Sequence, residues 1–348
     1  MTCQSGAAVV RNRFAGKLAQ MRVLAGDIGG TKTRVGVFEV DGVECTTVEE
    51  RSYLSRDYPG LGEIVVDFVG PGGMDCQAAC FGIAGPVTGR QMRTTNLPWV
   101  VDADVLEARS GIAHVALLND LEATGWGVSA LDENQTAVLN PGRPDAVGNG
   151  AVIAAGTGLG EGGIYWNGRE ARPFACEGGH ASFSPTDEQG DRLLQFLRRL
   201  HGHVSWERVL SGPGLAELFR FMVSEAGESE PGWFLEADRA GDPVPAVSEM
   251  ALEGRCDISV RTMELFARLY GEEAGNLALK IMATGGVWVG GGIAPRIRRF
   301  LEDGAFMNGF LAKGRMRPLL ESMPVRIVLD DRAALLGAAR RAASVISR

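Results

Sequence analysis

Two segments of this chain share one order of strand, glycine turn and strand. Glycines in such a turn let backbone N–H groups approach a phosphate closely. Two such units facing each other across a cleft can hold one nucleotide from both sides, so the duplication predicts a molecule of two lobes. The first unit covers residues 23–28, 29–31 and 33–40, and the second covers residues 151–155, 156–160 and 162–166.

Strands and helices alternate through the rest of the chain, which predicts an α/β architecture. A connector at residues 140–150, rich in Gly, Pro and Asp, marks the expected lobe boundary. We expect a small lobe at residues 21–135, with the C-terminal helix 333–348 packing back on it, and a large lobe at 136–332. Further strands are expected at 46–53, 77–83, 87–94, 114–118, 286–289 and 325–329, and helices at 61–68, 102–109, 122–131, 187–200, 214–223, 260–284, from Pro295 and from Ala333.

Composition limits the class of partner. The 348 residues are 45% hydrophobic and 22% charged, and no apolar run approaches the roughly 18 residues of a membrane span. The net charge of −8 disfavours nucleic acid or an acidic membrane surface as the principal partner. Six scattered cysteines predict reduced thiols. Cys76 and Cys80 are a possible metal or redox pair, but core packing is the favoured interpretation.

The first 20 residues contain Arg11, Arg13 and Lys17 and no acidic residue. This bias is shared with transit peptides. The favoured interpretation is a disordered extension at residues 1–20, with Met21 as the true start. The C-terminus carries no retention or lipidation signal.

The first glycine turn follows an aspartate. In the sequence Asp27-Ile28-Gly29-Gly30-Thr31 the glycine amides can bind phosphate and the Asp27 carboxylate can hold the water shell of a metal, which would be Mg²⁺. Asp-x-Gly turns also simply close hairpins, so the segment alone leaves both interpretations open.

Two later glycine loops have the same chemistry. Gly156-Thr157-Gly158 offers amides and a hydroxyl to terminal phosphates. A dinucleotide-binding fingerprint is excluded because a strand rather than a helix follows. Gly291 and Gly292, in a run of three glycines, can let an adenine ring lie against the backbone or can form a tight strand-to-helix turn.

Asn119-Asp120 stands at the end of an expected strand. Phosphoryl transfer from ATP needs positioning, charge neutralisation and a carboxylate that accepts the hydroxyl proton. Asp120 suits the role of base, although capping of the following helix explains an aspartate equally well.

Polar residues suited to a sugar follow in the second half. Sugar hydroxyls are bound by carboxylates, amides and imidazoles. A zinc role for His180 is weak, because no cysteine cluster accompanies His201 and His203. The candidate sugar ligands are Asn96, Asn119, Glu177, His180 and Glu207.

These motifs, in this order, resemble the bacterial glucokinase family of the actin/hexokinase/heat-shock-chaperone superfamily, and the resemblance covers the chain from about Val23 to the C-terminal helix. The most specific segments are 154–160, 176–180 and 203–214. The resemblance implies a two-lobed actin-like ATPase (ribonuclease H-like) fold with a cleft between a smaller and a larger α/β domain. It also implies a cytoplasmic homodimer that phosphorylates the 6-hydroxyl of glucose with ATP and Mg²⁺, the first step of glycolysis.

By this resemblance Asp120 is the general base, and the sugar ligands are those given above together with Asp120. The nucleotide and metal would face Asp27, Gly29, Gly30, Thr31, Gly156, Thr157, Gly158, Gly291 and Gly292, with Asp27 serving the metal.

Two features separate the chain from related patterns. The sugar kinases and repressors called ROK carry a cysteine-rich zinc loop after Glu-x-Gly-His, whereas Ala181-Ser182-Phe183 continues here without cysteine. Lys32 stands where the family often has Asn, which leaves the phosphoryl donor open. Alternatives are a kinase for another hexose or amino sugar, a polyphosphate-dependent kinase, and a nucleotide-gated regulatory ATPase. A DNA-binding repressor is disfavoured, because no helix-turn-helix precedes Asp27.

Overall fold

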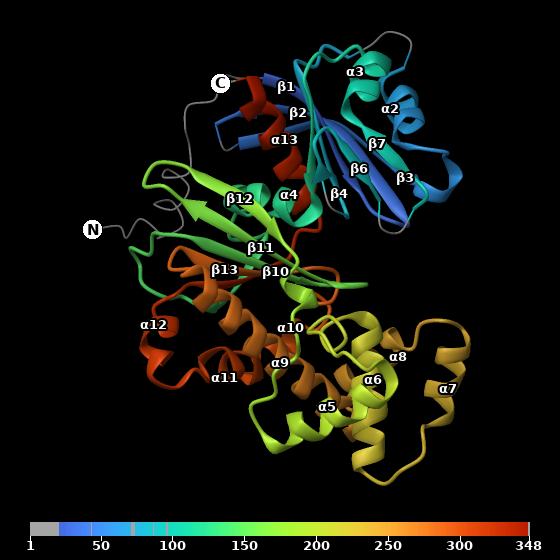
Figure 1. Cartoon of the computed structure of the whole chain (residues 1–348), viewed down its shortest axis with the longest axis vertical. Coiled ribbons are helices and arrows are strands. Elements are labelled where there is room, and N and C mark those ends of the chain that lie inside the picture. The colour runs from blue at the N-terminus through green and yellow to red at the C-terminus, as the bar shows by residue number, and fades with distance from the viewer. Residues whose placement is uncertain (1–20, 43, 71–73, 86, 95–96, 347–348) are drawn as a thin grey trace. The chain divides into compact units, whose positions relative to one another are not determined.

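The computed structural model describes residues 21–42, 44–70, 74–85, 87–94 and 97–346 (Figure 1). The expected extension at residues 1–20 and the candidate ligand Asn96 lie outside them. The chain divides into two compact units, described separately below. The first consists of Met1–Thr136, Gly162–Ala175 and Asp330–Arg348, and the second of Ala137–Glu161 and Cys176–Leu329.

The first unit is built on a five-stranded sheet of order β3-β2-β1-β4-β8. β1 and β2 form the antiparallel hairpin expected from the first glycine turn, and β1, β4 and β8 are parallel. A small sheet of order β5-β6-β7 accompanies it. The strands are β1 (Met21–Ile28), β2 (Lys32–Asp41), β3 (Glu44–Leu54), β4 (Ala78–Ile83), β5 (Val87–Thr88), β6 (Gln91–Arg93), β7 (Val100–Asp102) and β8 (Val115–Asn119).

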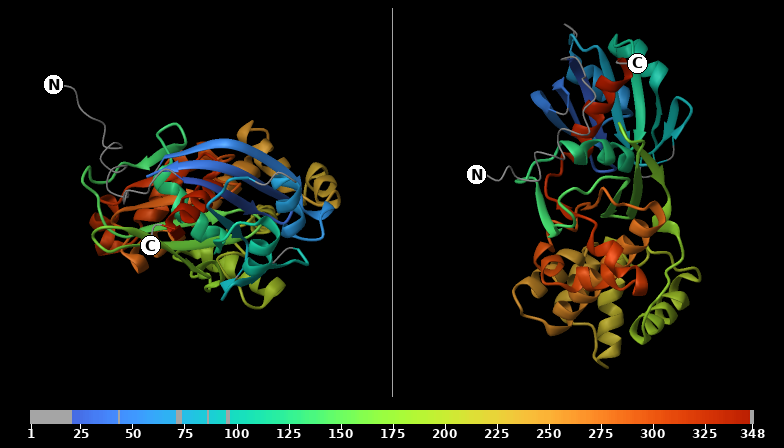
Figure 2. Two further views of the ribbon diagram at one scale, coloured as in Figure 1. Left: turned by 90° about the horizontal axis from the view of Figure 1, so that it is seen from above. Right: turned by 90° about the vertical axis from the view of Figure 1, so that its left-hand side faces the viewer.

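Helices cover both faces of the five-stranded sheet. On one face Phe68 of α2 and Leu106 of α3 share a core with Leu24 and Phe81. α13 packs on β1 and β4, beside α4 (Figures 1 and 2). The helices are α2 (Leu61–Val69), α3 (Ala103–Ser110), α4 (Asp120–Gly127) and α13 (Ala333–Ile346), with 3-10 helices η1 (Ser55–Asp57) and η2 (Val128–Ala130).

α4 and α13 pack backbone against backbone through glycines. A Cβ added to Gly127 would lie 1.9 Å from the carbonyl oxygen of Ala333, and one added to Gly337 would lie 1.8 Å from that of Ala123. No larger residue fits at either position without moving a helix. This close packing fixes α4, whose first residue is Asp120, against the C-terminal helix.

Residues 162–175, placed in the larger lobe by the sequence, group with the first unit. There Gly162 faces Leu121, and Pro173 lies against Gly125, both on α4. Residues 162–175 include most of β11 (Leu159–Trp166), which leaves the second glycine loop, and most of β12 (Ala171–Cys176), which follows it. The second segment of strand, glycine turn and strand is therefore divided between the two units.

The second sheet has the order β12-β11-β10-β13-β14-β9. Its centre is parallel: Ala154 of β10 pairs in register with Gly290 of β13, and Val289 with Ile327 of β14. Parallel strands covered on both faces read as continuous apolar runs, and these strands do so. The strands are β9 (Thr136–Asn140), β10 (Gly150–Ala155), β11 (Leu159–Trp166), β12 (Ala171–Cys176), β13 (Gly286–Gly290) and β14 (Val325–Val328).

The long helix α9 is the centre of the helical part of the second unit. It contacts β10 and β13 on one side and α6, α8 and α11 elsewhere, and its Phe266 and Tyr270 are fully buried. Within the described residues, no helix is long and apolar enough to cross a membrane. The helices are α5 (Glu188–His201), α6 (Gly212–Glu225), α7 (Gly232–Arg239), α8 (Val244–Leu252), α9 (Asp257–Ile281), α10 (Arg298–Glu302), α11 (Ala305–Leu311) and α12 (Arg317–Glu321), with η3 (Gly178–His180) and η4 (Gly314–Met316).

Two of the predicted elements are wrong. The strand expected at 87–94 is the hairpin β5-β6, because Gly89 takes φ +64° and turns the chain. The helix expected from Pro295 begins only at Arg298, after a run of turns. The strands β7, β9 and β12 and the helices α7, α8, α11 and α12 were not predicted.

Cys76 and Cys80 fit the core-packing interpretation. Cys80 is fully buried on β4, and burial raises the pKa of its thiol to about 12. Cys76 is half-buried against the core of the first unit, and the pKa of its thiol is raised to about 11. Both are free thiols, and such raised pKa values suppress thiolate chemistry near neutral pH.

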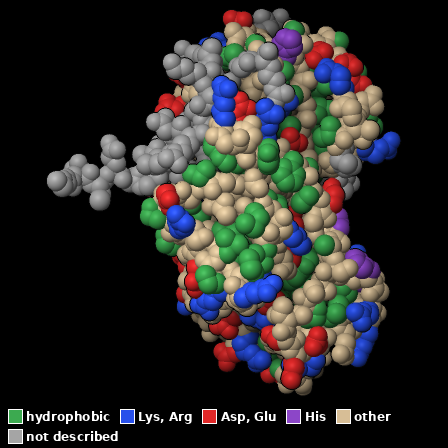
Figure 3. Space-filling model, turned by 60° about the vertical axis from the view of Figure 1, so that its left-hand side comes forward, with side chains coloured by type: hydrophobic (Ala, Val, Ile, Leu, Met, Phe, Trp, Pro, Cys, Tyr) green, Lys and Arg blue, Asp and Glu red, His purple; other side chains and the backbone are tan. Residues whose placement is uncertain are grey.

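Acidic and basic side chains are interspersed on the face seen in Figure 3 rather than gathered by sign. The net charge of −8 is therefore not concentrated there in a single acidic field.

Candidate active site

In the first unit the carboxyl ends of β1, β4 and β8 meet at one edge of the sheet. Ile28 pairs in register with Ile83, and Ile83 with Asn119. In open α/β sheets, ligands bind outside the carboxyl ends of the strands. This edge therefore brings Asp27, the first glycine turn and Asn119-Asp120 to one place.

The first glycine turn is a closed structure held by Ser55, the first residue of η1. The N–H of Gly29 donates to the carbonyl of Lys32 at 3.0 Å. The hydroxyl of Ser55 donates to the carbonyl of Gly29 at 2.8 Å, and the N–H of Ser55 donates to the carbonyl of Thr31 at 3.0 Å. Ser55, which the sequence analysis missed, thus fixes the turn so that Gly30 and Thr31 remain at the surface.

The environment of Asp27 disfavours the ionised form of its carboxyl group. Burial, followed by the nearby charge of Asp120, raises its pKa to about 7, while Arg34 acts in the opposite direction. Arg34 is itself paired with Asp331. A bound cation stabilises two carboxylates brought together in this way, so the residues present fit the expected Mg²⁺ site at Asp27. Among the residues described, no group of three or more His, Cys, Asp or Glu side chains forms a metal-binding cluster.

The helix-capping role considered for Asp120 belongs mainly to its neighbour. Asn119 is the N-cap of α4, and its side-chain oxygen accepts from the N–H of Leu121 at 2.9 Å. Asp120 is the first helical residue, and its Oδ1 accepts from the same N–H at 3.0 Å. The side-chain amide of Asn119 also donates to the carbonyl of Gly85 at 3.2 Å. Asp120 therefore stands at the N-terminal end of α4, directly after the capping residue.

In the second unit the loop Gly156-Thr157-Gly158 is held from both sides. The N–H of Gly156 donates to the carbonyl of Gly158, and the N–H of Gly212 donates to the carbonyl of Gly156, both at 2.8 Å. Ser211 caps the helix that begins at Gly212. The Ser211–Gly214 segment, noted in the sequence only as part of a resemblance, therefore supports the loop, and Thr157 stays exposed.

The third glycine loop lies beside the second. A Cβ added to Gly156 would be 4.0 Å from the nitrogen of Gly292. Gly291 has φ +80°, and a Cβ there would meet the carbonyl oxygen of Ala155 at 2.2 Å. No atom lies within 4 Å of a Cβ added to Gly292. The two loops thus present adjoining, exposed backbone at the ends of β10 and β13.

Tyr270 of α9 ties these two strand ends together. Its buried hydroxyl accepts from the N–H of Ala155 at 3.0 Å and lies 3.2 and 3.1 Å from the carbonyls of Ile153 and Gly290, to which it can donate. The sequence analysis missed this residue, because a tyrosine within an apolar helix is ordinarily part of the core.

The three expected sugar ligands of the second unit are brought together. His180 Nε2 lies 3.8 Å from Glu177 Oε2, and His180 Nδ1 lies 3.9 Å from Glu207 Oε1. The side chains of Glu177 and His180 are 70% and 62% exposed, so they are open to a ligand. Glu207 is anchored by the buried Trp206 beside it.

Glu207 connects this cluster to the glycine loop. Its Oε2 accepts from the N–H of Leu159 at 3.0 Å, and its own N–H donates to the carbonyl of Gly179 at 2.8 Å. A Cβ on Gly158 would lie 2.4 Å from Glu207 Oε2. The glycine loop and the acidic cluster are therefore one continuous structure within the second unit.

Each unit holds part of the predicted set. The first contains Asp27, Gly29, Gly30, Thr31, Asn119 and Asp120, and the second contains Gly156, Thr157, Gly158, Glu177, His180, Glu207, Gly291 and Gly292. Within each unit these residues converge on the carboxyl ends of parallel strands or on the loops beside them.

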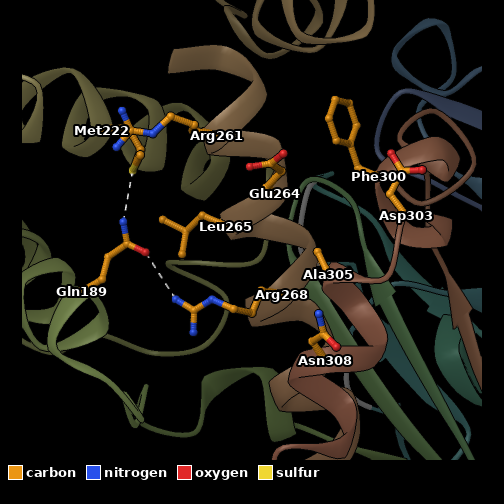
Figure 4. A pocket seen from close by; sticks show the side chains of 10 residues that line it. All are labelled: Gln189, Met222, Arg261, Glu264, Leu265, Arg268, Phe300, Asp303, Ala305 and Asn308. Atoms are coloured by element: carbon orange, nitrogen blue, oxygen red, sulfur yellow. Dashed lines mark hydrogen bonds between the residues drawn. The ribbon is translucent and has the colours of Figure 1, made fainter. Parts of the chain in front are cut away.

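A separate pocket of about 420 Å³ lies in the helical part of the second unit (Figure 4). Arg268, on its wall, is already bound to Asp187 and Glu272. None of the predicted site residues lines the pocket, so it is distinct from the candidate site. Its lining is Gln189, Met222, Arg261, Glu264, Leu265, Arg268, Phe300, Asp303, Ala305 and Asn308.

Comparison with known proteins identifies relatives over nearly the whole chain. Residues 24–345 match the family model described as Glucokinase. A glucokinase of Nostoc punctiforme is 40% identical over 336 residues, covering 92% of this chain and 98% of the relative. A glucokinase of Synechocystis sp. is 39% identical and covers 91% of this chain and 96% of the relative. The crystal structure of a glucokinase from an Antarctic psychrotroph superposes with a TM-score of 0.83 at 30% identity, covering 94% of this chain and all of the other.

Proposed function

This chain belongs to the glucokinase family, and we propose from that premise that it transfers the terminal phosphoryl group of ATP to the 6-hydroxyl of glucose. Its fold is the mixed α/β, two-domain actin-like ATPase fold of sugar kinases, as the sequence predicts. The observation that carries the proposal is the continuity of the Gly156–Gly158 loop with Glu177, His180 and Glu207, since it puts phosphate-binding backbone beside hydroxyl-binding side chains.

The sugar would be bound in the second unit by Glu177, His180 and Glu207, whose oxygens and ring nitrogens match the donors and acceptors of a hexose. By the resemblance, Asn96 and Asn119 are further proposed sugar ligands. The two glutamates accept from sugar hydroxyls, while a His180 ring nitrogen can donate or accept according to its tautomer.

The nucleotide would be bound by the glycine turns. The backbone of Gly29, Gly30, Thr31, Gly156, Thr157 and Gly158 would contact phosphates, and Gly291 and Gly292 the adenosine. Asp27 would hold Mg²⁺ through water, and the ion, when bound, neutralises phosphate charge.

Asp120 is proposed as the base that takes the proton of the 6-hydroxyl. Its position at the start of α4, next to the capping residue Asn119, keeps the carboxylate oriented. Family membership also leads us to propose a cytoplasmic homodimer acting at the first step of glycolysis.

The test is a coupled assay for glucose 6-phosphate with ATP and Mg²⁺, run beside mannose, fructose, N-acetylglucosamine and polyphosphate. We expect glucose-dependent turnover with ATP, and a fall in kcat of about 10²- to 10⁴-fold in Asp120→Asn. Circular dichroism would establish that the variant folds. Turnover only with another sugar or another phosphoryl donor would show that glucose or ATP is not the substrate. Near-normal turnover of Asp120→Asn would show that Asp120 is not the base.

A further inference from the structure

A buried carboxyl group lies directly beneath the proposed sugar-binding segment. Glu161 is on β11 and is 1% exposed. A Cβ added to Gly178 would lie 1.9 Å from Glu161 Oε2 and 2.7 Å from its carboxyl carbon. Gly178 is the residue between Glu177 and Gly179 at the start of η3, so the carboxyl group supports the backbone that carries both Glu177 and His180.

A second carboxyl group, that of Glu273 on α9, interacts with Glu161. Glu273 is fully buried, and its Oε2 accepts from the side-chain amide of Asn276 at 2.7 Å. Lys280 Nζ lies 3.4 Å from Glu273 Oε1. Burial and the interactions with Glu273 raise the pKa of Glu161 to about 8, and burial raises the pKa of Glu273 as well.

One proton explains the orphaned oxygen of this pair. Glu161 Oε1 is buried and has no hydrogen-bond partner among the described residues. Two carboxylates cannot hydrogen-bond each other, but a carboxylic acid can donate to a carboxylate. With one shared proton the pair carries a single negative charge, which Lys280 balances.

The other charged or titratable groups that act on the pair come from three elements. Lys280 and Tyr270 lie on α9, Lys313 follows α11, and Cys176 ends β12. Burial raises the pKa of Cys176 and lowers that of Lys313. Lys280 is 57% exposed, so solvent screens the single charge that it presents to the pair.

The segment above the pair has little freedom to absorb a displacement. A Cβ on Gly179 would lie 2.1 Å from the carbonyl oxygen of Leu159, so this backbone rests on β11 with no side chain between. The carbonyl of Gly179 also accepts from the N–H of Glu207. A movement at Gly178 therefore reaches Glu177, His180 and Glu207 together.

We propose that Glu161 and Glu273 share one proton and thereby position the Glu177–His180 segment for glucose. This rests on the proposed function. Loss of that proton to solvent puts a second negative charge under Gly178, where mutual repulsion and hydration of the two carboxylates displace the segment. Glu161 and Glu273 are positioning residues, because they act on the sugar through the segment above them.

The test measures KM for glucose and kcat between about pH 6 and pH 9.5 in the wild type, Glu161→Gln and Glu273→Gln. If the protonated pair alone binds glucose well, the wild-type KM rises about tenfold for each pH unit above the pKa of the pair. An amide replaces the acid without a charge and can donate to the remaining carboxylate. We therefore expect Glu161→Gln to match the wild type at neutral pH and to lack the alkaline rise in KM.

Glu272→Gln is the matched control. Glu272 is buried on the same helix and has a raised pKa, but its carboxylate contacts Arg268 and Thr186 instead of Glu161. It should keep the wild-type alkaline rise, as should Cys176→Ser. The same glucose titration followed by calorimetry without ATP separates binding from the chemical step.

An alkaline rise of KM in Glu161→Gln equal to that of the wild type overturns the proposal. If Glu161→Gln does not fold, the same comparison with Glu273→Gln decides. Absence of glucose turnover by the wild type at neutral pH refutes the proposed function, and the positioning role falls with it. Turnover with an unchanged profile in the variants refutes the positioning role alone.

Discussion

At the scale of single residues, Glu207 links the glycine loop to the other proposed sugar ligands of the second unit. One carboxylate oxygen accepts from the N–H of Leu159 and the other faces His180. A carboxylate in such a position both shapes the glycine loop and remains available to a hydroxyl, so its loss should affect sugar binding first.

Glu207→Gln should raise KM for glucose by about 10- to 100-fold, because a hydrogen bond to a charged group contributes roughly 1.5–3 kcal/mol. Steady-state kinetics at saturating ATP measure this. Glu217→Gln is a fitting control, since Glu217 also pairs with a histidine, His201, but on α6 and outside the proposed site. Equal KM values for Glu207→Gln and the wild type would remove Glu207 from the sugar site.

Gly178→Ala tests the contact between the segment and the carboxyl group below it. The added Cβ would meet Glu161 Oε2 at 1.9 Å, so we expect KM for glucose to rise at least about tenfold, the effect of a displacement costing some 1.4 kcal/mol. In Gly178→Ala with Glu161→Ala, only the Cβ of residue 161 at 3.4 Å remains, and part of the loss should be recovered.

Gly232→Ala controls for the general cost of an added methyl group, because nothing lies within 4 Å of its Cβ. If the double variant is as impaired as the sum of the two single variants, the two residues do not interact as described.

At the scale of elements, the glycine loops depend on the strands and helices that carry them. β10 and β13 end side by side, and the Tyr270 hydroxyl of α9 bonds to both. The loops bearing Gly156 and Gly291 leave from these ends. Their spacing is therefore set by a residue that contacts neither proposed substrate.

Tyr270→Phe should lower the free energy of unfolding by about 1–3 kcal/mol, because the buried N–H of Ala155 loses its acceptor. It should also raise KM for ATP more than KM for glucose. Urea denaturation and two-substrate kinetics measure these effects. Tyr165→Phe, at a side chain that is 53% exposed, should change neither. A selective effect of Tyr270→Phe on glucose would contradict the assignment.

The sequence predicts elements best where glycine turns and apolar strands coincide. The hairpin of β1 and β2 and the helix expected at 102–109 are confirmed, since local chemistry, such as the capping side chain of Asp102, decides them. α7 and α8 were missed because each follows a proline in place of a side chain that caps the helix, and because each is only eight or nine residues long. α8 is placed by tertiary packing against α6 and α9, and α7 by packing against α8 and against Phe219 of α6.

The site divides in the same way. Residues that present backbone or charge to a ligand, such as Gly158 and Glu177, have visible motifs. Glu161, Ser55 and Tyr270 have none, because each acts through a partner distant in sequence: Gly178 and Glu273 for Glu161, Gly29 for Ser55, and the ends of β10 and β13 for Tyr270. Only the folded chain reveals such pairs.

At the scale of the whole molecule, one buried and one half-buried carboxyl group make stability depend on pH. The folded pKa values of Asp27 and Glu161, about 7 and about 8, exceed their ordinary values of 3.8 and 4.5. Between the ordinary and the raised values the folded state holds protons that the unfolded state releases, so stability falls as pH rises and levels off above about pH 8.

We therefore expect the free energy of unfolding to be about 4 kcal/mol smaller at pH 8.5 than at pH 6, as measured by chemical denaturation. The salt-bridged carboxylates with lowered pKa values, such as Glu63 and Asp331, titrate below this range and do not offset the trend. Asp27→Asn combined with Glu161→Gln should flatten the profile. A stability that increases from pH 6 to pH 8.5 would contradict the burial of these groups.

The helix α13 is made of the last residues described, yet it packs on β1 and β4, which are made among the first. During synthesis on the ribosome, the apolar side chains of Val23, Ala25 and their neighbours stay exposed to solvent until α13 emerges. The segments of the second unit are all released before that moment. A chain that terminates before Ala333 lacks α13, so the first unit, which carries Asp27 and Asp120, cannot be completed. Such a chain contains all of the second unit only if it ends after Leu329.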